Sequence, residues 1–414
     1  MTSRHHREGE YVRLGVWRVA TIILLALILL WLSVGLTVSL VLGRHQSGYA
    51  LRLWPNGAEA AARRSAELLL TQREITAAKK LAVSALTKEP ANAAAARDLG
   101  LVYSYQGKAK ESEAAFLYAE RMSRRDLPTQ MGLIESRVQA EDIPGALLHY
   151  DRAMRSSLES RKTLIPILVT AAQDPAAVDK IIKVLITRPN WRSEFIDALV
   201  GQSPGANAMG KILSALQLDP ADPTQARQLG IGLRHMVDLG AIPEAYALYR
   251  QVRKFSPSNV PLLRGGDFET AGPLMPFEWQ LADGTDRQGV REAREGAQGQ
   301  FALSLYGDSA GEIARQLMVL PPGNYRLSGL AGGVSADGGR PTIAIICAKD
   351  AVVLANVALP TGSSRRTFGG TLKIPASCPS QWMFISIAGS LDRQNEAPWI
   401  DAIQVRPDRS VSVR

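Results

Sequence analysis

Residues 19–43 contain no charged side chain and form the longest apolar stretch of the 414-residue chain. As an α-helix they would rise about 37 Å, enough to cross a hydrocarbon core about 30 Å thick with some tilt. A buried helix of a soluble protein is seldom apolar on every side over this length. The stretch therefore predicts a transmembrane helix.

A cleaved signal peptide is the main alternative to a retained anchor. Signal peptides have a shorter apolar region, about 7–15 residues, which small residues follow at the cleavage site. The stretch here ends VSLVLGRHQ and has no such pattern, so we favour an anchor. Basic residues resist translocation and set the orientation. They predict a cytoplasmic N-terminus and an exported remainder, since four precede the stretch and two follow it closely: Arg4, Arg7, Arg13, Arg18, Arg44 and Arg52.

The charge distribution argues against nucleic-acid binding. The chain has 48 Lys and Arg against 39 Asp and Glu, a formal net charge of +9. A nucleic-acid protein gathers its basic groups on one face. Here the surplus lies beside the apolar stretch or is spread over residues 57–258, and residues 259–414 carry equal numbers of basic and acidic groups. We expect no nucleic-acid partner.

A spacing of 34 residues organises the segment after the anchor. The clearest unit is DLGLVYSYQGKAKESEAAFLYAERM, and shifting its register by one period in either direction again meets small and aromatic residues. This pattern resembles the tetratricopeptide repeat (TPR) family, in which stacked helical hairpins bind proteins or peptides. The positions that carry the resemblance are Leu99, Gly100, Tyr103, Phe116 and Ala119, then Ala78, Ala82, Ala85 and Pro90 before them, and Leu133, Ala146, Tyr150 and Ala153 after them.

The repeat reading also has a physical basis. One helical hairpin cannot bury its apolar stripe alone, so at least three must stack. A fourth unit fits Leu229 through Pro257, whereas between about 160 and 220 the register fails and helical spacing alone remains. We expect degenerate helical hairpins there. The repeats would bind a protein partner, although a simple spacer between membrane and next domain stays open.

Beyond about residue 259 the pattern changes to short apolar runs separated by Gly- and Pro-rich turns. Such spacing is typical of an antiparallel β-sandwich. We expect acids such as Asp283, Asp286, Glu292 and Glu295 to lie in a loop. The predicted strands are 301–307, 312–320, 324–332, 341–348, 351–358, 366–374, 382–389 and 399–405.

Three elements of this region resemble the jelly-roll, galactose-binding-like folds of carbohydrate-binding modules. They are GGDFE at 265–269 with PFEW at 276–279, the LPPGNYRLS hairpin at 320–328, and the closing WIDAIQV. In many such modules an early Glu and a late Asp hold a structural calcium. The resemblance places these roles on Glu269 and Asp401, whose hard oxygens suit Ca²⁺. Solvated carboxylates or turn caps are the alternative, and we expect no other cofactor.

Sugar binding in such modules depends on exposed aromatic rings. The candidates are Trp279, Tyr306, Tyr325, Trp382 and Trp399. Because Trp382 and Trp399 lie within apolar strands, burial in the core is the expected role for both. Trp279 lies in a less regular segment and is the remaining candidate for stacking on a ligand.

The two cysteines, Cys347 and Cys378, lie beside neighbouring predicted strands. In an oxidising compartment they would pair as a disulfide. Two buried free thiols are the alternative.

No catalytic signature stands out. The chain lacks a G-x-S-x-G elbow, a P-loop, an H-E-x-x-H motif and a Rossmann fingerprint after a strand,. His149 and His235 lie within predicted repeat helices, where structural roles are expected. We therefore expect a binding protein and not an enzyme.

The sequence thus predicts a multidomain chain with five parts. They are a cytoplasmic N-terminus (1–18), a transmembrane helix (19–43), a linker (44–56), a TPR-like α-helical solenoid (57–258) and an antiparallel β-sandwich, or jelly roll (259–414). This combination resembles bacterial envelope proteins that are anchored in the inner membrane and face the periplasm. We expect a scaffold for protein partners that also binds polysaccharide, in envelope or exopolysaccharide assembly. A protein-only adaptor and a polysaccharide-modifying enzyme are the alternatives.

Overall fold

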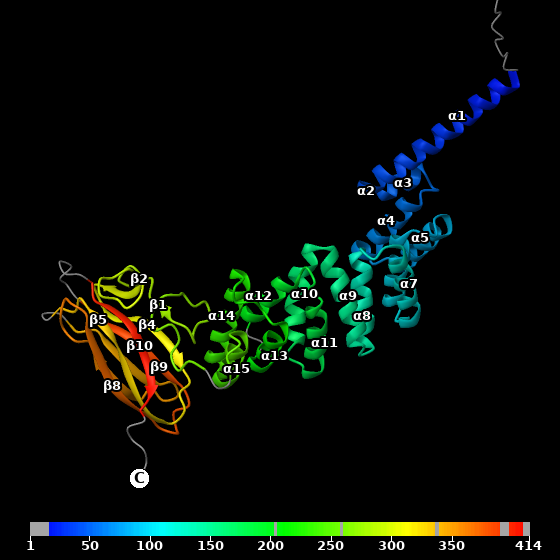
Figure 1. Ribbon diagram of the computed structural model, residues 1–414. Helices are drawn as coiled ribbons and strands as arrows, with labels where there is room; N and C mark the ends of the chain where they lie inside the picture. Colours follow the sequence, from blue (N-terminus) through cyan, green and yellow to red (C-terminus); the bar gives the residue numbers. More distant parts are fainter. Residues whose placement is uncertain (1–15, 203–204, 257–259, 336–338, 390–396, 409–414) are drawn as a thin grey trace, which may run out of the picture. The chain divides into compact units, whose positions relative to one another are not determined.

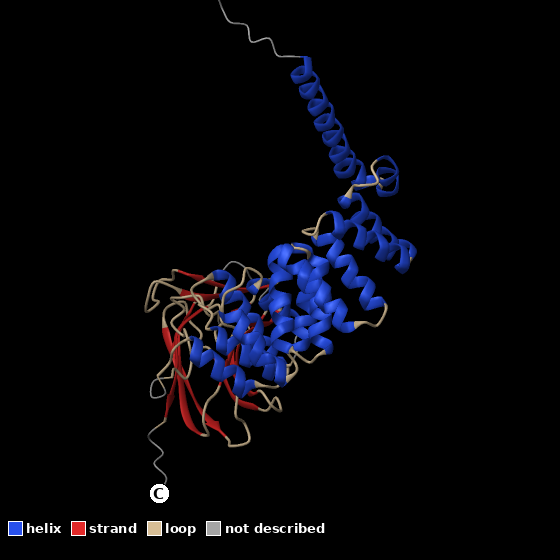
Figure 2. Ribbon diagram, turned by 90° about the vertical axis from the view of Figure 1, so that its right-hand side faces the viewer, coloured by secondary structure: helices blue, strands red, loops and turns tan. Residues whose placement is uncertain are grey.

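The computed structural model describes residues 16–202, 205–256, 260–335, 339–389 and 397–408. Most of the expected cytoplasmic N-terminus, with Arg4, Arg7 and Arg13, lies outside these ranges. The chain divides into two compact units, Met1–Leu164 and Ile165–Arg414. Helices precede strands along the chain (Figure 1), and Figure 2 distinguishes the helices, in blue, from the strands, in red.

The apolar stretch forms one continuous helix. It is α1 (Val16–Thr37) followed by the π-helical turn η1 (Val38–Leu42). Residues Val19–Leu42 have a mean hydropathy of 2.7 and only 6% of the most apolar part is buried by the rest of the chain. A helix this long and apolar can cross a membrane, as the sequence predicts. The short helices α2 (Gly43–His45) and α3 (Ser47–Leu53) follow it.

Helical hairpins make up the remainder of the first unit. The pairs α4 with α5, α6 with α7, and α8 with α9 pack against each other. Several helices begin at an Asn or Asp that accepts a backbone N–H of the first turn, among them Asn92, Asp126 and Asp142,. The bounds are α4 (Ala58–Glu67), η2 (Leu68–Gln72), α5 (Ile75–Lys88), α6 (Ala93–Tyr105), α7 (Ala109–Met122), α8 (Leu127–Gln139), α9 (Ile143–Ser156) and α10 (Leu158–Ala171), whose last turns belong to the second unit.

Phe116 shows how the repeats stack. Its ring is buried against Gly100 on α6 and Gly132 on α8. A Cβ atom at Gly100 or Gly132 would lie 2.8 Å or 2.5 Å from this ring, so both positions need glycine. One aromatic side chain thus joins its own hairpin to the next, as the TPR-like pattern predicts.

Asp98 on α6 carries a buried charge within this array. Its side chain is fully buried, Arg97 donates to Oδ1, and Oδ2 has no hydrogen-bond partner. Burial raises the pKa of Asp98 to about 6, and the neighbouring Arg97 charge opposes the shift only in part. The folded state therefore holds this proton more tightly than the unfolded state does.

The stability difference between the Asp98→Asn variant and the parent should therefore depend on pH. Ionisation of Asp98 destabilises the fold, a penalty absent below about pH 4 and complete above about pH 6,. The variant should gain stability relative to the parent as pH rises from 4.5 to 7. Guanidinium unfolding of the full chain in detergent, followed by circular dichroism, measures this. Glu159→Gln, a change in a side chain that is 79% exposed, is the control; an equal difference at both pH values would contradict the assignment.

The second unit begins with irregular helical hairpins and ends in the sandwich. Its helices are α11 (Pro175–Ile186), α12 (Arg192–Gln202), α13 (Ala206–Leu216), α14 (Pro223–Asp238) and α15 (Ile242–Val252). Its strands are β1 (Gln280–Leu281), β2 (Arg287–Glu292), β3 (Ala302–Gly307), β4 (Ala310–Met318), β5 (Gly323–Gly332), β6 (Thr342–Cys347), β7 (Val353–Ala358), β8 (Arg366–Ile374), β9 (Gln381–Ala388) and β10 (Trp399–Pro407).

The strands form two antiparallel five-stranded sheets, the expected β-sandwich. Their orders are β1-β4-β9-β6-β7, the first sheet, and β2-β3-β10-β5-β8, the second sheet. The eight predicted strands are present within about two residues. The expected loop around Asp283–Glu295 is wrong in part, because Arg287–Glu292 forms strand β2 on the edge of the second sheet. Strand β2 is rich in charged residues and is half-buried, so its sequence lacks the alternation of apolar and polar residues that predicts a strand,.

The sandwich core lies between the sheets and is built mainly from inward-pointing residues of β3–β6 and β8–β10. Central members include Leu303, Ile313, Ile345, Ile385 and Ile400, each fully buried. Cys347, at the end of β6, is joined by a disulfide to Cys378, before β9, and both residues are buried. The predicted pairing is therefore present, and closing this loop stabilises the fold by roughly 3–4 kcal/mol on the chain-entropy model.

A buried ion pair fastens the last helix to the sandwich. Arg253, just after α15, donates through Nε to Glu278 Oε1 at 2.6 Å, and Glu278 is 2% exposed. Leu274 N–H donates to the other carboxylate oxygen, and Tyr249 OH approaches Oε1 at 3.3 Å. The Phe277 ring stacks on Tyr249 with centroids 5.1 Å apart. Helix and sandwich thus share one buried contact within the second unit.

Candidate functional site

The outer face of the first sheet carries two half-exposed aromatic rings. On β9, Met383 and Ile385 point into the core, so Trp382 and Phe384 point the other way,. Their ring centroids lie 6.0 Å apart with an interplanar angle of 29°. The two neighbouring rings form a partly buried aromatic platform on the outer face of the sheet.

Polar groups of neighbouring strands border this platform. Cross-strand register places Arg315 of β4 opposite Phe384, and Gln280 of β1 opposite Arg315. The Arg315 guanidinium lies 5.4 Å from the centre of the Trp382 ring, and its Nε donates to Gln280 Oε1 at 3.1 Å. Glu312 Oε1 lies 3.4 Å from Arg315 Nε. We call Gln280, Glu312, Arg315, Trp382 and Phe384 the Trp382 face.

The Trp382 face extends toward β6 and β7 through further outward positions. Thr342 and Ala344 of β6 pair with Ser386 and Phe384, and Asn356 of β7 pairs with Ala344. The face therefore combines stacked rings with amide, hydroxyl, carboxylate and guanidinium groups. Such a surface can cover the apolar face of a sugar ring while its rim donates to and accepts from hydroxyls.

The expectation that Trp382 is a core residue is wrong. In β9 the run WMFISI is apolar on both faces, so alternation alone could not decide which set is buried,.

The other aromatic candidates from the sequence differ in how far they are buried. Trp399 is buried over Gly332, as expected, and Tyr325 is buried as well. Tyr306 is 38% exposed and bonded to Glu292 and Arg294 on the second sheet.

Trp279, the ring favoured from sequence, lies at the edge of the core. Its Nε1 donates to Gly265 O at 2.9 Å, and its centroid is 5.4 Å from that of Phe268. The side chain is partly buried against the sandwich core. Its role in stacking on a ligand stays a prediction.

Glu269 and Asp401 both bind one loop, between β2 and β3. Asp401 accepts from Gln298 N–H at 2.6 Å, and Glu269 accepts from Phe301 N–H at 3.1 Å. A Cβ at Gly299 would come 1.9 Å from Glu269 Oε1, so this loop and the carboxylate approach each other closely. The structure thus brings the two residues together, as the resemblance implies.

Asp401 lies in a buried environment with other acidic groups nearby. Asp401 is 1% exposed, and burial raises its pKa, while hydrogen bonds from Gln298 and Ala402 lower it in part. The charges of Glu269 and Asp267 raise it further. Within the described ranges no group of three or more His, Cys, Asp or Glu is arranged to hold a metal ion. Carbonyl and water oxygens would have to complete a calcium shell here.

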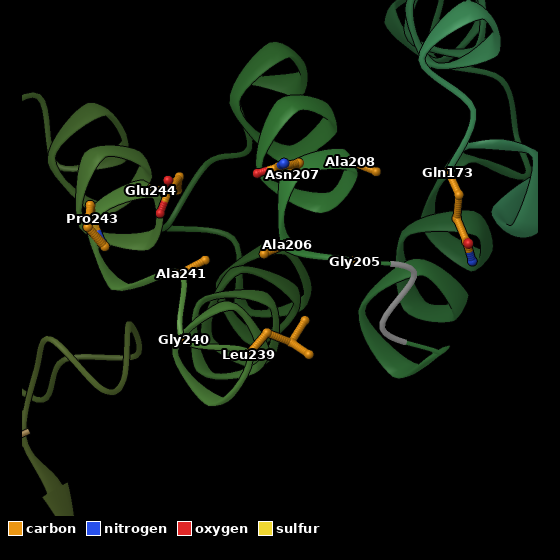
Figure 3. Close-up of a pocket in the computed structure, with 10 residues that line it drawn as sticks. All are labelled: Gln173, Gly205, Ala206, Asn207, Ala208, Leu239, Gly240, Ala241, Pro243 and Glu244. Atoms are coloured by element: carbon orange, nitrogen blue, oxygen red, sulfur yellow. The ribbon is translucent and has the colours of Figure 1, made fainter. Parts of the chain in front are cut away.

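A separate hollow of about 530 Å³ lies among the helices of the second unit (Figure 3). It opens between the starts of α13 and α15 and the turn that follows α14. Its polar side chains are Gln173, Asn207 and Glu244, and small residues and backbone form much of the remaining wall. It presents fewer hydrogen-bonding side chains than the Trp382 face and its extension on β6 and β7.

Comparison with known proteins gives likeness of architecture. No protein-family model matches the chain, and no curated protein matches it in sequence. Among solved structures, the module CBM61 in complex with β-1,4-galactotriose is 19% identical, over 36% of this chain and 100% of that chain, with a TM-score of 0.28. A CBM4 structure is 17% identical, over 35% of this chain and 99% of that one, with a TM-score of 0.27.

A helical protein is similar over the repeats. YrrB, a TPR protein with an unusual peptide-binding site, is 16% identical, over 52% of this chain and 94% of that chain, with a TM-score of 0.27. The helical hairpins and the two-sheet sandwich fit the architectures that the sequence resembles. At these identities and TM-scores the likeness says nothing about ligands, so function is argued below from the chain's own side chains.

Proposed function

We propose that this protein is a membrane-anchored scaffold that binds glycan on the Trp382 face and protein partners through its helical repeats. The observation that carries the glycan proposal is the half-exposed Trp382–Phe384 pair with Arg315 and Gln280 on its border. The exposed part of such a ring pair can stack on a flat apolar occupant. A sugar ring has such a face and also hydroxyls for the polar rim.

Exposed apolar side chains support a protein partner for the repeats. Leu70, Tyr105 and Val138 are 72%, 60% and 58% exposed. They end the first helices of three successive repeats, since they lie 35 and 33 residues apart. Leu70 and Val138 are two periods of 34 residues apart and Tyr105 is one residue out of that register, so the three are exposed apolar groups near the ends of successive helices that a partner could cover,.

The location that we propose is the inner membrane of a Gram-negative bacterium, with the bulk of the chain in the periplasm. The apolar helix and the disulfide support it, because disulfides persist in oxidising compartments,. Tethering to the membrane plane would raise the local concentration of both binding surfaces near an assembly complex. Envelope or exopolysaccharide assembly is the process that we propose, with a binding and not a catalytic role.

Replacing Trp382 by Ala should weaken glycan binding by about two- to tenfold, since an aromatic contact contributes about 0.5–1.5 kcal/mol. The full chain in detergent would first be screened on an array of bacterial polysaccharides and of gluco- and galacto-oligosaccharides. Calorimetric titration with a captured oligosaccharide then compares the parent, Trp382→Ala and Tyr306→Ala. Tyr306 is the matched control, because it is a partly exposed aromatic on the other sheet.

Two outcomes would contradict the glycan proposal. One is unchanged affinity in Trp382→Ala, which would move binding to another surface. The other is an absence of binding to every glycan on the array, which would favour a protein-only adaptor. Release of cleaved product from any glycan would instead reveal an enzyme.

We further propose that Glu269 and Asp401 hold a structural Ca²⁺. Millimolar Ca²⁺ should then raise the unfolding temperature of the sandwich relative to protein in EDTA, since a ligand at 100 times its Kd stabilises by about 2.7 kcal/mol. Scanning calorimetry of the full chain measures the shift. Asp401→Asn should abolish it, and Asp283→Asn, a change to an exposed carboxylate, should keep it. An identical unfolding temperature in Ca²⁺ and EDTA would leave these carboxylates as loop caps only.

A further inference from the structure

We infer that residues 44–54 form a second membrane contact, an interfacial element that lies at the level of the outer leaflet beside the apolar helix. The inference rests on the proposed membrane span but goes beyond it. The sequence alone treats 44–56 as a linker. The structure instead folds this segment back onto the helix that precedes it.

The fold-back is fixed by direct contacts with one side of the apolar helix. The rings of Trp31 and Trp54 lie 4.3 Å apart, centroid to centroid. A Cβ atom at Gly35 would lie 2.4 Å from the Trp54 ring, and one at Gly57 would lie 2.5 Å from Ser39 Oγ. Gly35 and Ser39 are one helical turn apart and are both buried, although Leu36 and Leu40 are exposed,. Small residues thus let the returning chain approach closely.

The depth of these contacts in the membrane follows from helix geometry. A hydrocarbon core of about 30 Å takes about 20 helical residues. Counted from Val19, where the uncharged stretch begins, such a core reaches to about Ser39. By this count Trp31 and Gly35, which Trp54 contacts, lie about 12 Å and 6 Å inside the outer edge of the core, and Ser39, beside Gly57, lies at that edge,. The returning chain therefore reaches the outer part of the core, the depth at which an interfacial element inserts. A crossing that begins at Val19 brings the returning chain to the lipid.

Helix α3 exposes apolar and basic side chains and buries small ones. Ser47 and Ala50 are buried, and Ser47 Oγ donates to Glu67 on α4 at 2.6 Å. On the other side Tyr49 and Leu53 are 52% and 51% exposed. Leu51 is partly buried against the cluster around Ala61 and Ala62, so α3 has an inward leucine and, with Tyr49 and Leu53, a second apolar side that faces outward.

Lipid is the occupant that fits this exposed surface. The surface continues the apolar helix through Leu40 and Val41, which are 49% and 58% exposed. Exposed Arg44 and Arg52 flank it. Tryptophan and tyrosine are enriched where a bilayer meets water, and arginine side chains there reach toward phosphate groups. The combination of two aromatic residues, leucine and arginine beside a transmembrane helix suits the headgroup region.

Spin labelling tests this placement. The two native cysteines are joined to each other, so a nitroxide would react with a single added cysteine. Leu53→Cys and Tyr49→Cys report on the proposed element. Leu158→Cys, at a leucine that is 70% exposed on α10, reports on water, and Leu29→Cys, in the middle of α1, reports on the bilayer. Each full-length variant is placed as one chain per nanodisc of phosphatidylethanolamine and phosphatidylglycerol, which excludes coverage by a second copy.

The readout is collision of the nitroxide with oxygen, which concentrates in lipid, relative to an aqueous nickel complex. We expect a ratio severalfold higher at positions 49 and 53 than at position 158, and highest at position 29. Equal ratios at 49, 53 and 158, with a high ratio at 29, would overturn the interfacial contact and leave the span intact. A low ratio at position 29 would overturn the span itself, and with it this inference.

Discussion

The need to remove a 24-residue apolar helix from water is the constraint on which the rest of this structure depends. Little of Val19–Leu42 is buried by the rest of the chain, and the helix is long and apolar enough to cross a membrane, where lipid would cover it,. A helix is also the one open-ended element whose backbone groups are satisfied within lipid. In the topology that we propose, the helix divides the chain into a short leading segment and a large remainder on the other side of the membrane. The disulfide, the sandwich and the repeats all lie in that remainder.

The helical middle could be predicted closely because its signal is a period. A spacing of 34 residues identified Ala82, Phe116 and Ala119 as packing positions, and all three are buried. The degenerate stretch after residue 160 was predicted to be helical and is, although no repeat register marked its hairpins. Local capping residues such as Asp174 and Asp222 start helices there. Helical spacing and capping residues therefore predicted helices in the stretch where the 34-residue repeat could not be followed.

The candidate site was harder to predict, because it depends on which face of a strand is buried. Strand β9 is apolar at consecutive positions, so Trp382 could belong to the core or to the surface. Only pairing with β4 and β6 on either side, and packing of Met383 against the second sheet, decide the question. The approach of Glu269 and Asp401, 132 residues apart in sequence, came from family resemblance. Strands β1 and β2 were missed, because one is two residues long and the other is charged.

The buried Glu278 carboxylate links the last helix of the second unit to its β-sandwich. Its carboxylate is bonded from the helical side by Arg253 and from its own loop by Leu274 N–H. Burial and the nearby Glu278 charge raise the pKa of Tyr249, which keeps its hydroxyl protonated and able to donate. Removing one partner of such a pair leaves a buried charge, a costly state. The last helical hairpin is therefore part of the structure that presents the Trp382 face.

The side of the membrane on which the sandwich lies is the claim that everything proposed here requires. The most direct measurement fuses alkaline phosphatase, active only after export, or green fluorescent protein, fluorescent in the cytoplasm, after Arg414 in a Gram-negative host. We expect the phosphatase fusion to be active and the fluorescent-protein fusion to show no fluorescence. Fluorescence without phosphatase activity would place the sandwich in the cytoplasm and contradict the proposed topology.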